Sequence, residues 1–301
     1  NRSRAVRALP GDEDALVYLK RVQTVLRRSR LAGLFKCAAS AIAGGVPSLA
    51  SSGQLLSRTF GASIADRCGI ASPPWASCSD RTAIAALCSD HGFPFVLKRD
   101  DTSAGMGVRV CNDGESLGIA LAGCQSAGIV QSYVPGIPAM QAAVALDGRL
   151  LGTCGWVKER CFPEPFGPSA IVARIDDDSM KRAAAAFAAE SGFNGFFSLD
   201  FIVGEGAPLL IEINPRPTPV CHLGGLAGAL AAALGAPQAD TRVESPARLA
   251  VFPQELRRNP GSANDDGLVH DLPHDDPPLL RALCDAFLNG NVPTVRRSLA
   301  R

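Results

Sequence analysis

The segment LLIEINPRPTP, residues 209–219, constrains the fold more than any other stretch of the chain. It reads as an apolar strand that carries Glu212 and Asn214 two residues apart and then stops at a Pro-Arg-Pro sequence. A second apolar run, GFFSLDFIV at 195–203, precedes it across the turn GEGAP. Two such runs joined by a glycine-containing turn predict an antiparallel β-hairpin.

The side chains of this hairpin predict a metal site. Centring the turn on Gly206 sets Asp200 opposite Glu212 and Ser198 opposite Asn214. Because residues two apart on a strand share a face, the two carboxylates and the amide project together. Paired residues lie roughly 4.5–5.5 Å apart at Cβ, so the two carboxylates need a cation, and oxygen ligands favour Mg²⁺ or Mn²⁺. The alternative is a solvent-facing strand with two ordinary acids, against which the apolar flanks of both strands argue.

The segment FPFVLKRDDTSAGMGV, residues 93–108, is a candidate phosphate site. Lys98 ends an apolar strand on which it shares a face with Val96, and a loop with two glycines follows. Lysine supplies a point charge, and glycines let backbone N–H groups approach phosphate oxygens closely. The lysine precedes the glycines, so this is not the G-x-x-x-x-G-K-[ST] loop. A lysine at the end of an ordinary hairpin strand stays open as the alternative.

A third segment, IVQSYVPG at 129–136, places Gln131 at the end of an apolar strand before a Pro-Gly linker. An adenine needs an apolar slot with one backbone donor and one acceptor, which such a strand can supply. Alone, this segment does not identify a nucleotide site.

Composition narrows the class of protein. With 301 residues, 47% hydrophobic and 20% charged, the chain is globular and long enough for two or three subdomains. A net charge of +1 gives no reason to expect nucleic acid or an anionic membrane as partner, and no segment reads as a membrane span. Ten cysteines without a C-x-x-C pair fit reduced thiols in a cytoplasm. No secretory signal is visible, although a chain that begins at Asn1 leaves a removed segment open.

Hydrophobic periodicity and capping residues predict the remaining elements. A hairpin is expected to turn at Asp147-Gly148, between apolar strands. Helices are expected at 12–30, 57–69, 80–91, 114–126, 177–191, 223–234 and 277–289.

Taken in this order, FVLKRDDTSAGMGV, IVQSYVPG, GFFSLDFIV and LLIEINPRPTP resemble the ATP-grasp superfamily over about residues 58–235. The E-x-N-P-R sequence at the end of the hairpin is the most specific part. The resemblance implies an α+β ATP-grasp fold whose two subdomains clamp ATP. It divides the chain into a shortened or truncated N-terminal region (1–57), a lid subdomain (58–135), a catalytic metal subdomain (136–240) and a peripheral C-terminal segment (241–301).

The resemblance also implies a function. Family members mostly ligate a small-molecule carboxylate to an amine or similar nucleophile through an acyl phosphate, using Mg-ATP. An ATP-grasp kinase that phosphorylates a small molecule and a nucleotide-binding protein without turnover are the alternatives. A cytoplasmic location is expected, and a homodimer is left open.

Carried over residue by residue, the family pattern assigns roles to the motifs. Asp200 and Glu212 would hold one magnesium or manganese ion, and Glu212 and Asn214 would share a second. Lys98 would contact the α- and β-phosphates and the adenine edge, and Arg58 would contact the phosphates. Arg216 would neutralise charge on the γ-phosphate or acyl phosphate. The lid would consist of Thr102, Ser103, Gly105 and Gly107, and the adenine would meet Gln131, Tyr133 and Val134.

The sequence departs from the family pattern at several places, including Gln131 where members often have glutamate and Pro215-Arg216-Pro217 where the D-alanine ligase pattern has a small-residue turn. Ile137-Pro138-Ala139 stands where members usually place a glutamate that holds the ribose. Val220-Cys221-His222 stands where bicarbonate-using members need a glutamate base, which argues against bicarbonate chemistry.

Overall fold

The structure is a computed structural model that describes residues 18, 19, 22, 57–100, 102, 105–124, 127–235, 246–264, 267–273 and 276–288. The predicted lid residue Ser103 and nearly all of the predicted helix at 12–30 lie outside these residues. The chain divides into two compact units. Residues 1–158 and 174–245 form the first, and residues 159–173 and 246–301 form the second.

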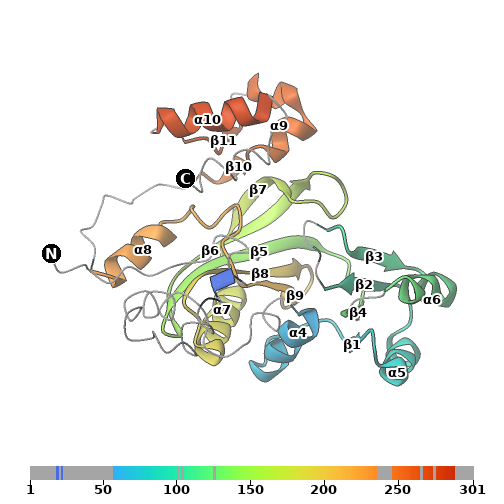
Figure 1. Ribbon diagram of the computed structural model, residues 1–301. Helices are drawn as coiled ribbons and strands as arrows, with labels where there is room; N and C mark the ends of the chain where they lie inside the picture. The colour runs from blue at the N-terminus through green and yellow to red at the C-terminus, as the bar shows by residue number, and fades with distance from the viewer. Residues whose placement is uncertain are drawn as a thin grey trace. The chain divides into compact units, whose positions relative to one another are not determined.

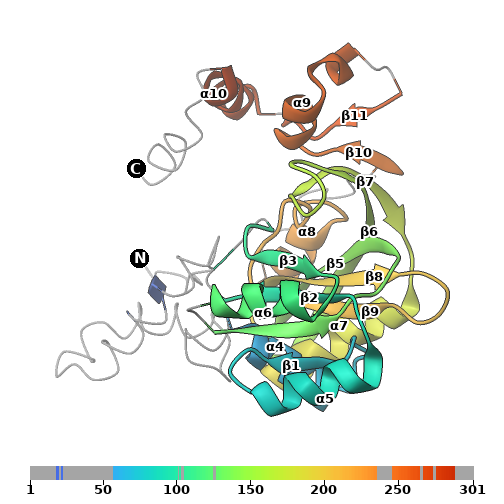
Figure 2. The same ribbon diagram turned by 90° about the vertical axis from the view of Figure 1, so that its right-hand side faces the viewer.

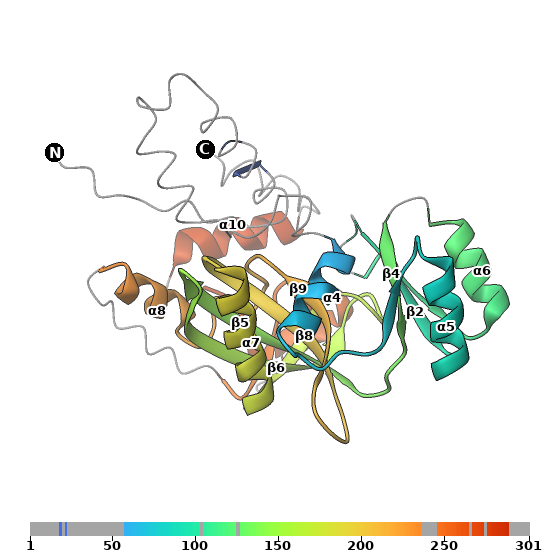
Figure 3. The ribbon, with the colours of Figure 1, turned by 90° about the horizontal axis from the view of Figure 1, so that it is seen from below.

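The first unit contains a four-stranded antiparallel sheet in the order β1-β4-β2-β3. Its strands are β1 (Trp75–Ser77), β2 (Phe95–Arg99), β3 (Val108–Cys111) and β4 (Gly128–Ser132). Helices α5 (Arg81–His91) and α6 (Gly114–Ala122) cover one face of it (Figures 2 and 3). Phe95 and Leu97 are buried in the core on that face. Lys98 follows Leu97 in the strand and therefore belongs to the opposite face, as predicted.

The ends of α5 and α6 follow from their caps. Asp80 accepts a hydrogen bond from the Ala83 N–H at 2.9 Å, and Gly92, with φ 68°, ends the helix where predicted. A capping box of Asp113 and Ser116 begins α6. This helix ends at Ala122 and is shorter than the predicted 114–126.

One glycine sets the spacing of the central strands β2 and β4. A Cβ on Gly128 would lie 2.3 Å from the Lys98 carbonyl oxygen, whereas a Cβ on Gly118 in α6 would meet nothing within 4 Å. We expect Gly128→Ala to lower the free energy of unfolding by about 1–3 kcal/mol, because backbone must move. The control Gly118→Ala should raise it by about 0.5–1 kcal/mol. Urea denaturation of both variants measures the difference, and equal stabilities would contradict the close strand contact.

The first unit also holds a larger antiparallel arrangement in the order β6-β5-β8-β9. Its strands are β5 (Ile137–Leu146), β6 (Arg149–Cys161), β8 (Gly195–Val203) and β9 (Leu209–Asn214). The predicted turn between β5 and β6 is confirmed, since Asp147 and Gly148 both have positive φ, 50° and 76°. Two such residues are typical of a type I′ turn, whose twist matches the strands it joins.

One face of these strands is closed by two helices, α7 (Asp178–Ser191) and α4 (Arg58–Arg67) (Figure 1). Three phenylalanines, Phe187, Phe193 and Phe197, lie with ring centroids 5.0–5.7 Å apart in this core. α4 contributes Ile64 and Ala65 to the same core. The opposite face is left for the polar side chains described below. A further short helix, α8 (Leu226–Ala233), follows β9.

The second unit contains strands that the sequence pattern did not predict. β10 (Arg248–Ala250) pairs antiparallel with β7 (Ser169–Ile175) and parallel with β11 (Val269–His270). The unit also contains α9 (Gln254–Arg258), a 3-10 turn at Pro260–Asn264, and α10 (Pro277–Leu288), the last close to the prediction. None of the helices in the described part of the chain is long and apolar enough to cross a bilayer.

The architecture is the predicted α+β one of helices and mainly antiparallel sheets. The subdomain boundaries expected at 58, 135 and 240 stay predictions.

Candidate metal and nucleotide site

The β8–β9 hairpin pairs its residues as the sequence predicted. Asp200 lies opposite Glu212, and Ser198 lies opposite Asn214. Beyond Asp200 the register shifts by one residue, so that Phe201 faces Leu210, and the pairing near the turn differs from the one centred on Gly206. The register shift does not affect the pairing of the polar residues at the other end of the hairpin.

Two cross-strand rows place these residues on a single face of the sheet. Pairing across β6, β5, β8 and β9 gives the row Trp156, Met140, Asp200 and Glu212. The next row is Cys154, Ala142, Ser198 and Asn214. Because neighbouring residues on a strand point to opposite faces, this polar face is the one that α4 and α7 do not cover.

Asp200 is held in an environment that disfavours its charge. Burial, and then the nearby Glu212 carboxylate, raise the pKa of Asp200 from 3.8 to about 6. Lys158, Arg216 and a hydrogen bond from the Ser198 hydroxyl at 3.3 Å oppose that rise. A cation placed between the carboxylates would remove the repulsion.

Glu212 already has one cationic partner. The Arg58 guanidinium lies 2.9 Å from it, from Nη1 to Oε1, with side-chain exposures of 11% for Arg58 and 33% for Glu212. The Arg58 Nε donates to the Arg99 carbonyl oxygen at 2.9 Å, and its main-chain N–H donates to the Asp100 carboxylate at 3.0 Å. The family pattern predicts phosphate contacts for Arg58, whereas its pairing with Glu212 was not predicted.

Lys98 lies between the two sheets of the first unit. Its Nζ donates to Gln131 Oε1 at 2.7 Å and to the Ile211 carbonyl oxygen at 2.8 Å. Burial lowers the pKa of Lys98 from 10.5 to about 8, with Arg58 contributing to the fall and the Glu212 carboxylate opposing it. The predicted phosphate lysine therefore lies beside the predicted metal carboxylates.

Two glycines in the loop between β2 and β3 accept backbone hydrogen bonds from the flanking strands. The Arg99 N–H donates to the Gly107 carbonyl at 3.1 Å, and the Val108 N–H donates to the Gly105 carbonyl at 3.1 Å. A Cβ on Gly107 would lie 2.0 Å from Thr102 Oγ1, and Gly105 has φ 78°. Both positions therefore require glycine.

The three residues predicted to meet the adenine, Gln131, Tyr133 and Val134, lie in different environments. Gln131 is buried and is oriented by Lys98. The Tyr133 N–H already donates to the Pro94 carbonyl at 3.0 Å, while its side chain is exposed. Tyr133 can therefore offer its ring and carbonyl group, and Val134 follows as the next backbone donor.

Two more arginines contribute positive charge around the polar face. Arg216 donates through its main-chain N–H to the Asn214 carbonyl at 2.8 Å, and its charge partly opposes the rise in the pKa of Asp200. Arg174 stacks over the Trp156 ring at 5.2 Å and contacts Cys154. Lys158 and Arg174 lie outside the family pattern, although the sequence makes them candidates to face the cleft, and the cross-strand register places Trp156 in the row of Asp200.

The donor set fits a hard divalent cation. It consists of two carboxylates on neighbouring strands and the amide of Asn214, which is 9% exposed. Magnesium typically takes one or two carboxylates and completes its shell with water and phosphate oxygens. Among the described residues no group of three or more His, Cys, Asp and Glu side chains could hold a metal by itself. Water or phosphate oxygens would complete the shell of a metal held by Asp200, Glu212 and Asn214.

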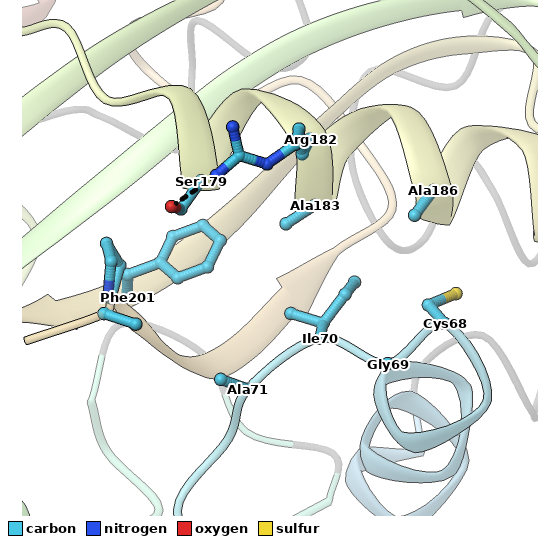
Figure 4. Close-up of a pocket in the computed structure, with 11 residues that line it drawn as sticks. Cys68, Gly69, Ile70, Ala71, Ser179, Arg182, Ala183, Ala186 and Phe201 are labelled. Atoms are coloured by element: carbon cyan, nitrogen blue, oxygen red, sulfur yellow. Dashed lines mark hydrogen bonds between the residues drawn. The ribbon is translucent and has the colours of Figure 1, made fainter.

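A cavity of about 260 Å³ lies on the other face of these strands and is not part of this site (Figure 4). Apolar side chains such as Ile70, Ala183 and Phe201 line it, with Arg182 and Ser179 on α7 at one side. It contains none of the predicted site residues.

Comparison with known proteins extends the resemblance. A family model described as an ATP-grasp domain matches residues 69–220, just over half of the chain. The structure of N5-carboxyaminoimidazole synthetase from Staphylococcus aureus, complexed with ADP, is 14% identical with a TM-score of 0.55, covering 87% of this chain and 74% of that one. D-alanine–D-alanine ligase from Bacillus anthracis is 20% identical with a TM-score of 0.47, covering 63% of this chain and 65% of the ligase. No curated protein matches the sequence.

Proposed function

The chain belongs to the ATP-grasp family, and on that premise we propose that it is a Mg-ATP-dependent ligase that joins a carboxylate to an amine or similar nucleophile. The observation that carries the proposal is the pairing of Asp200 with Glu212 beside Lys98 and Arg58. Two carboxylates and two cations within one small region suit a metal–triphosphate complex, whose parts carry both signs of charge. The fold is shared by enzymes with different substrates, so the acid and the nucleophile are not transferred from the similar structures.

The proposed roles are those that the family resemblance implies, and the positions of the side chains support them. Asp200, Glu212 and Asn214 would hold two Mg²⁺ or Mn²⁺ ions, which supply charge neutralisation between the phosphates. Lys98 and Arg58 would bind the phosphates from the side of the small sheet. Thr102, Gly105 and Gly107 would form the lid, and Gln131, Tyr133 and Val134 would meet the adenine. Arg216, tied to Asn214 through its backbone, would bind the γ-phosphate and the acyl phosphate.

The proposed reaction has two steps. A carboxylate oxygen of the acid attacks the γ-phosphorus, the bond to the ADP oxygen breaks, and an acyl phosphate forms. The amine then attacks the acyl carbon, inorganic phosphate leaves, and the proton of the amine passes to solvent or phosphate. Positioning and charge neutralisation are sufficient for both steps, as in phosphoryl transfer generally. A side-chain nucleophile is not needed.

The proposal is tested by ADP release from Mg-ATP in the presence of pooled small acids and amines. Hydroxylamine added with the acids alone should intercept the acyl phosphate and give a hydroxamate. ADP release without hydroxamate, accompanied by a stable phosphorylated product, would favour a kinase of the same fold. No ADP release and unchanged nucleotide affinity with and without magnesium would indicate a nucleotide-binding protein without turnover.

A further inference from the structure

Arg58 joins the lid to the metal hairpin through one side chain. Its Nε is bonded to the Arg99 carbonyl and its main-chain N–H to Asp100, both at the start of the loop between β2 and β3. Its Nη2 lies 3.4 Å from the Thr102 carbonyl in the same loop. The remaining nitrogen, Nη1, reaches Glu212 on β9. The guanidinium is thus held by two carbonyl groups, Arg99 at the end of β2 and Thr102 in the lid, and its Nη1 contacts a proposed metal ligand.

The charges around Glu212 oppose the entry of a bare metal ion. Arg58 and Lys98 lie beside its carboxylate, while Lys158 and Arg216 act on the neighbouring Asp200. Four cationic side chains therefore act on the two carboxylates, and the Asp100 carboxylate also contacts Arg58. A free divalent cation would compete with these cations for the two carboxylates, whereas a nucleotide brings phosphate groups that can take up a displaced cation.

We propose that Arg58 is the counter-ion of Glu212 that a metal ion must displace, so that the metal binds together with the nucleotide and not before it. The inference rests on the proposed function, because it takes Glu212 as a metal ligand. When Glu212 turns to the metal, Arg58 remains tied to the end of β2 by its contacts with Arg99 and Asp100, and to the lid by its contact with Thr102. Its freed Nη1 then faces the phosphates, and one residue couples metal binding to lid position.

Mn²⁺ binding measured by electron paramagnetic resonance tests this proposal without any turnover. In nucleotide-free protein, Arg58→Gln should bind Mn²⁺ about fivefold more tightly than the parent, since a competing ion pair is worth up to about 1 kcal/mol. With saturating ADP, the further gain in Mn²⁺ affinity should be smaller in the variant than in the parent. The matched control is Arg67→Gln, on the same helix, which breaks the exposed Arg67–Glu190 pair of 3.0 Å and should leave Mn²⁺ affinity unchanged.

A second variant keeps the test decisive if Arg58→Gln does not fold. Arg58→Lys retains the charge but cannot hold the Arg99 carbonyl and Glu212 together, so its Mn²⁺ affinity should lie between those of the parent and Arg58→Gln. An affinity equal to or weaker than the parent's, in whichever variants fold, would overturn the proposal. Absence of Mn²⁺ binding to the parent even with ADP would instead overturn the proposed function.

Discussion

Replacing Glu212 by glutamine should reduce metal-dependent ADP formation by roughly a hundredfold or more, because a metal that neutralises transition-state charge supplies several kcal/mol. Glutamine keeps the shape and hydrogen-bonding capacity of the side chain but removes the negative charge that a shared ligand needs. The stabilisation that Mg-ATP gives to the parent in thermal melts should disappear as well.

The metal-free stability of Glu212→Gln distinguishes a functional carboxylate from a structural one. Loss of the partly exposed ion pair with Arg58 costs up to about 1 kcal/mol. Relief of the repulsion that raises the pKa of Asp200 offsets that loss. The melting temperature without metal should therefore change little. Glu190→Gln is the matched control, since it also loses one arginine partner and lies outside the site.

Two results would contradict this expectation for Glu212. Near-normal turnover of the glutamine variant would show that Glu212 is not a metal ligand. A large loss of metal-free stability, beyond that of Glu190→Gln, would show that its main role is to pair with Arg58.

Replacing Lys98 by methionine should weaken ATP binding by about 1.5–3 kcal/mol, the usual value of a charge-assisted hydrogen bond, which is about 10- to 150-fold in affinity. Methionine fills the space of the lysine stem without donating to Gln131 or to the Ile211 carbonyl. Isothermal titration calorimetry with Mg-ATP measures the change. The control Lys181→Met removes an exposed lysine paired with Asp178 and should bind ATP like the parent.

The pH dependence of the same titration identifies the charge that is lost. Since the pKa of Lys98 is about 8 in the free protein, and phosphate would raise it, ATP affinity of the parent should fall as pH rises above 8. Lys98→Met should lack this fall. An affinity that is unchanged in the variant, or a parent whose affinity is constant from pH 7 to 9, would count against a phosphate contact.

The effect of rising pH on the stability of the nucleotide-free protein should be opposite to its effect on ATP affinity. The folded-state pKa of Lys98, about 8, lies below its ordinary 10.5, so between these values the unfolded chain binds more protons. Stability of the nucleotide-free protein should therefore rise with pH across that window through this group, and this contribution should be absent in Lys98→Met.

The polar end of the metal hairpin was predictable because local rules determine it. Both strands alternate around a glycine turn, and this alone gave the bounds of β8 and β9 and the pairing of Asp200 with Glu212. The same rules did not give the register near the turn, because a bulge is decided by packing on both faces. The strand β7 was missed although Ile171 and Val172 are β-branched and buried, since a proline-rich stretch precedes it.

The sequence pattern could not predict the burial and the partners of the charged side chains. Alternation places Lys98 on the face opposite Phe95, but only the packing of the two sheets shows that its ammonium group is buried against Gln131 and Ile211. The pairing of Arg58 with Glu212 joins residues from distant parts of the chain, for which periodicity carries no information. Roles can be assigned to residue types from motifs, whereas their partners depend on tertiary contacts.

The arrangement of the site also affects how the chain folds. Asp200 and Glu212 belong to one hairpin and meet by closing a short loop, whereas the contact of Lys98 with Ile211 spans 113 residues. Loop closure grows more costly with length, and local hairpins form earlier than distant contacts. The two carboxylates should therefore come together before their cations arrive. High salt, which screens such a pair, should speed early hairpin formation, and Glu212→Gln should reproduce that acceleration at low salt.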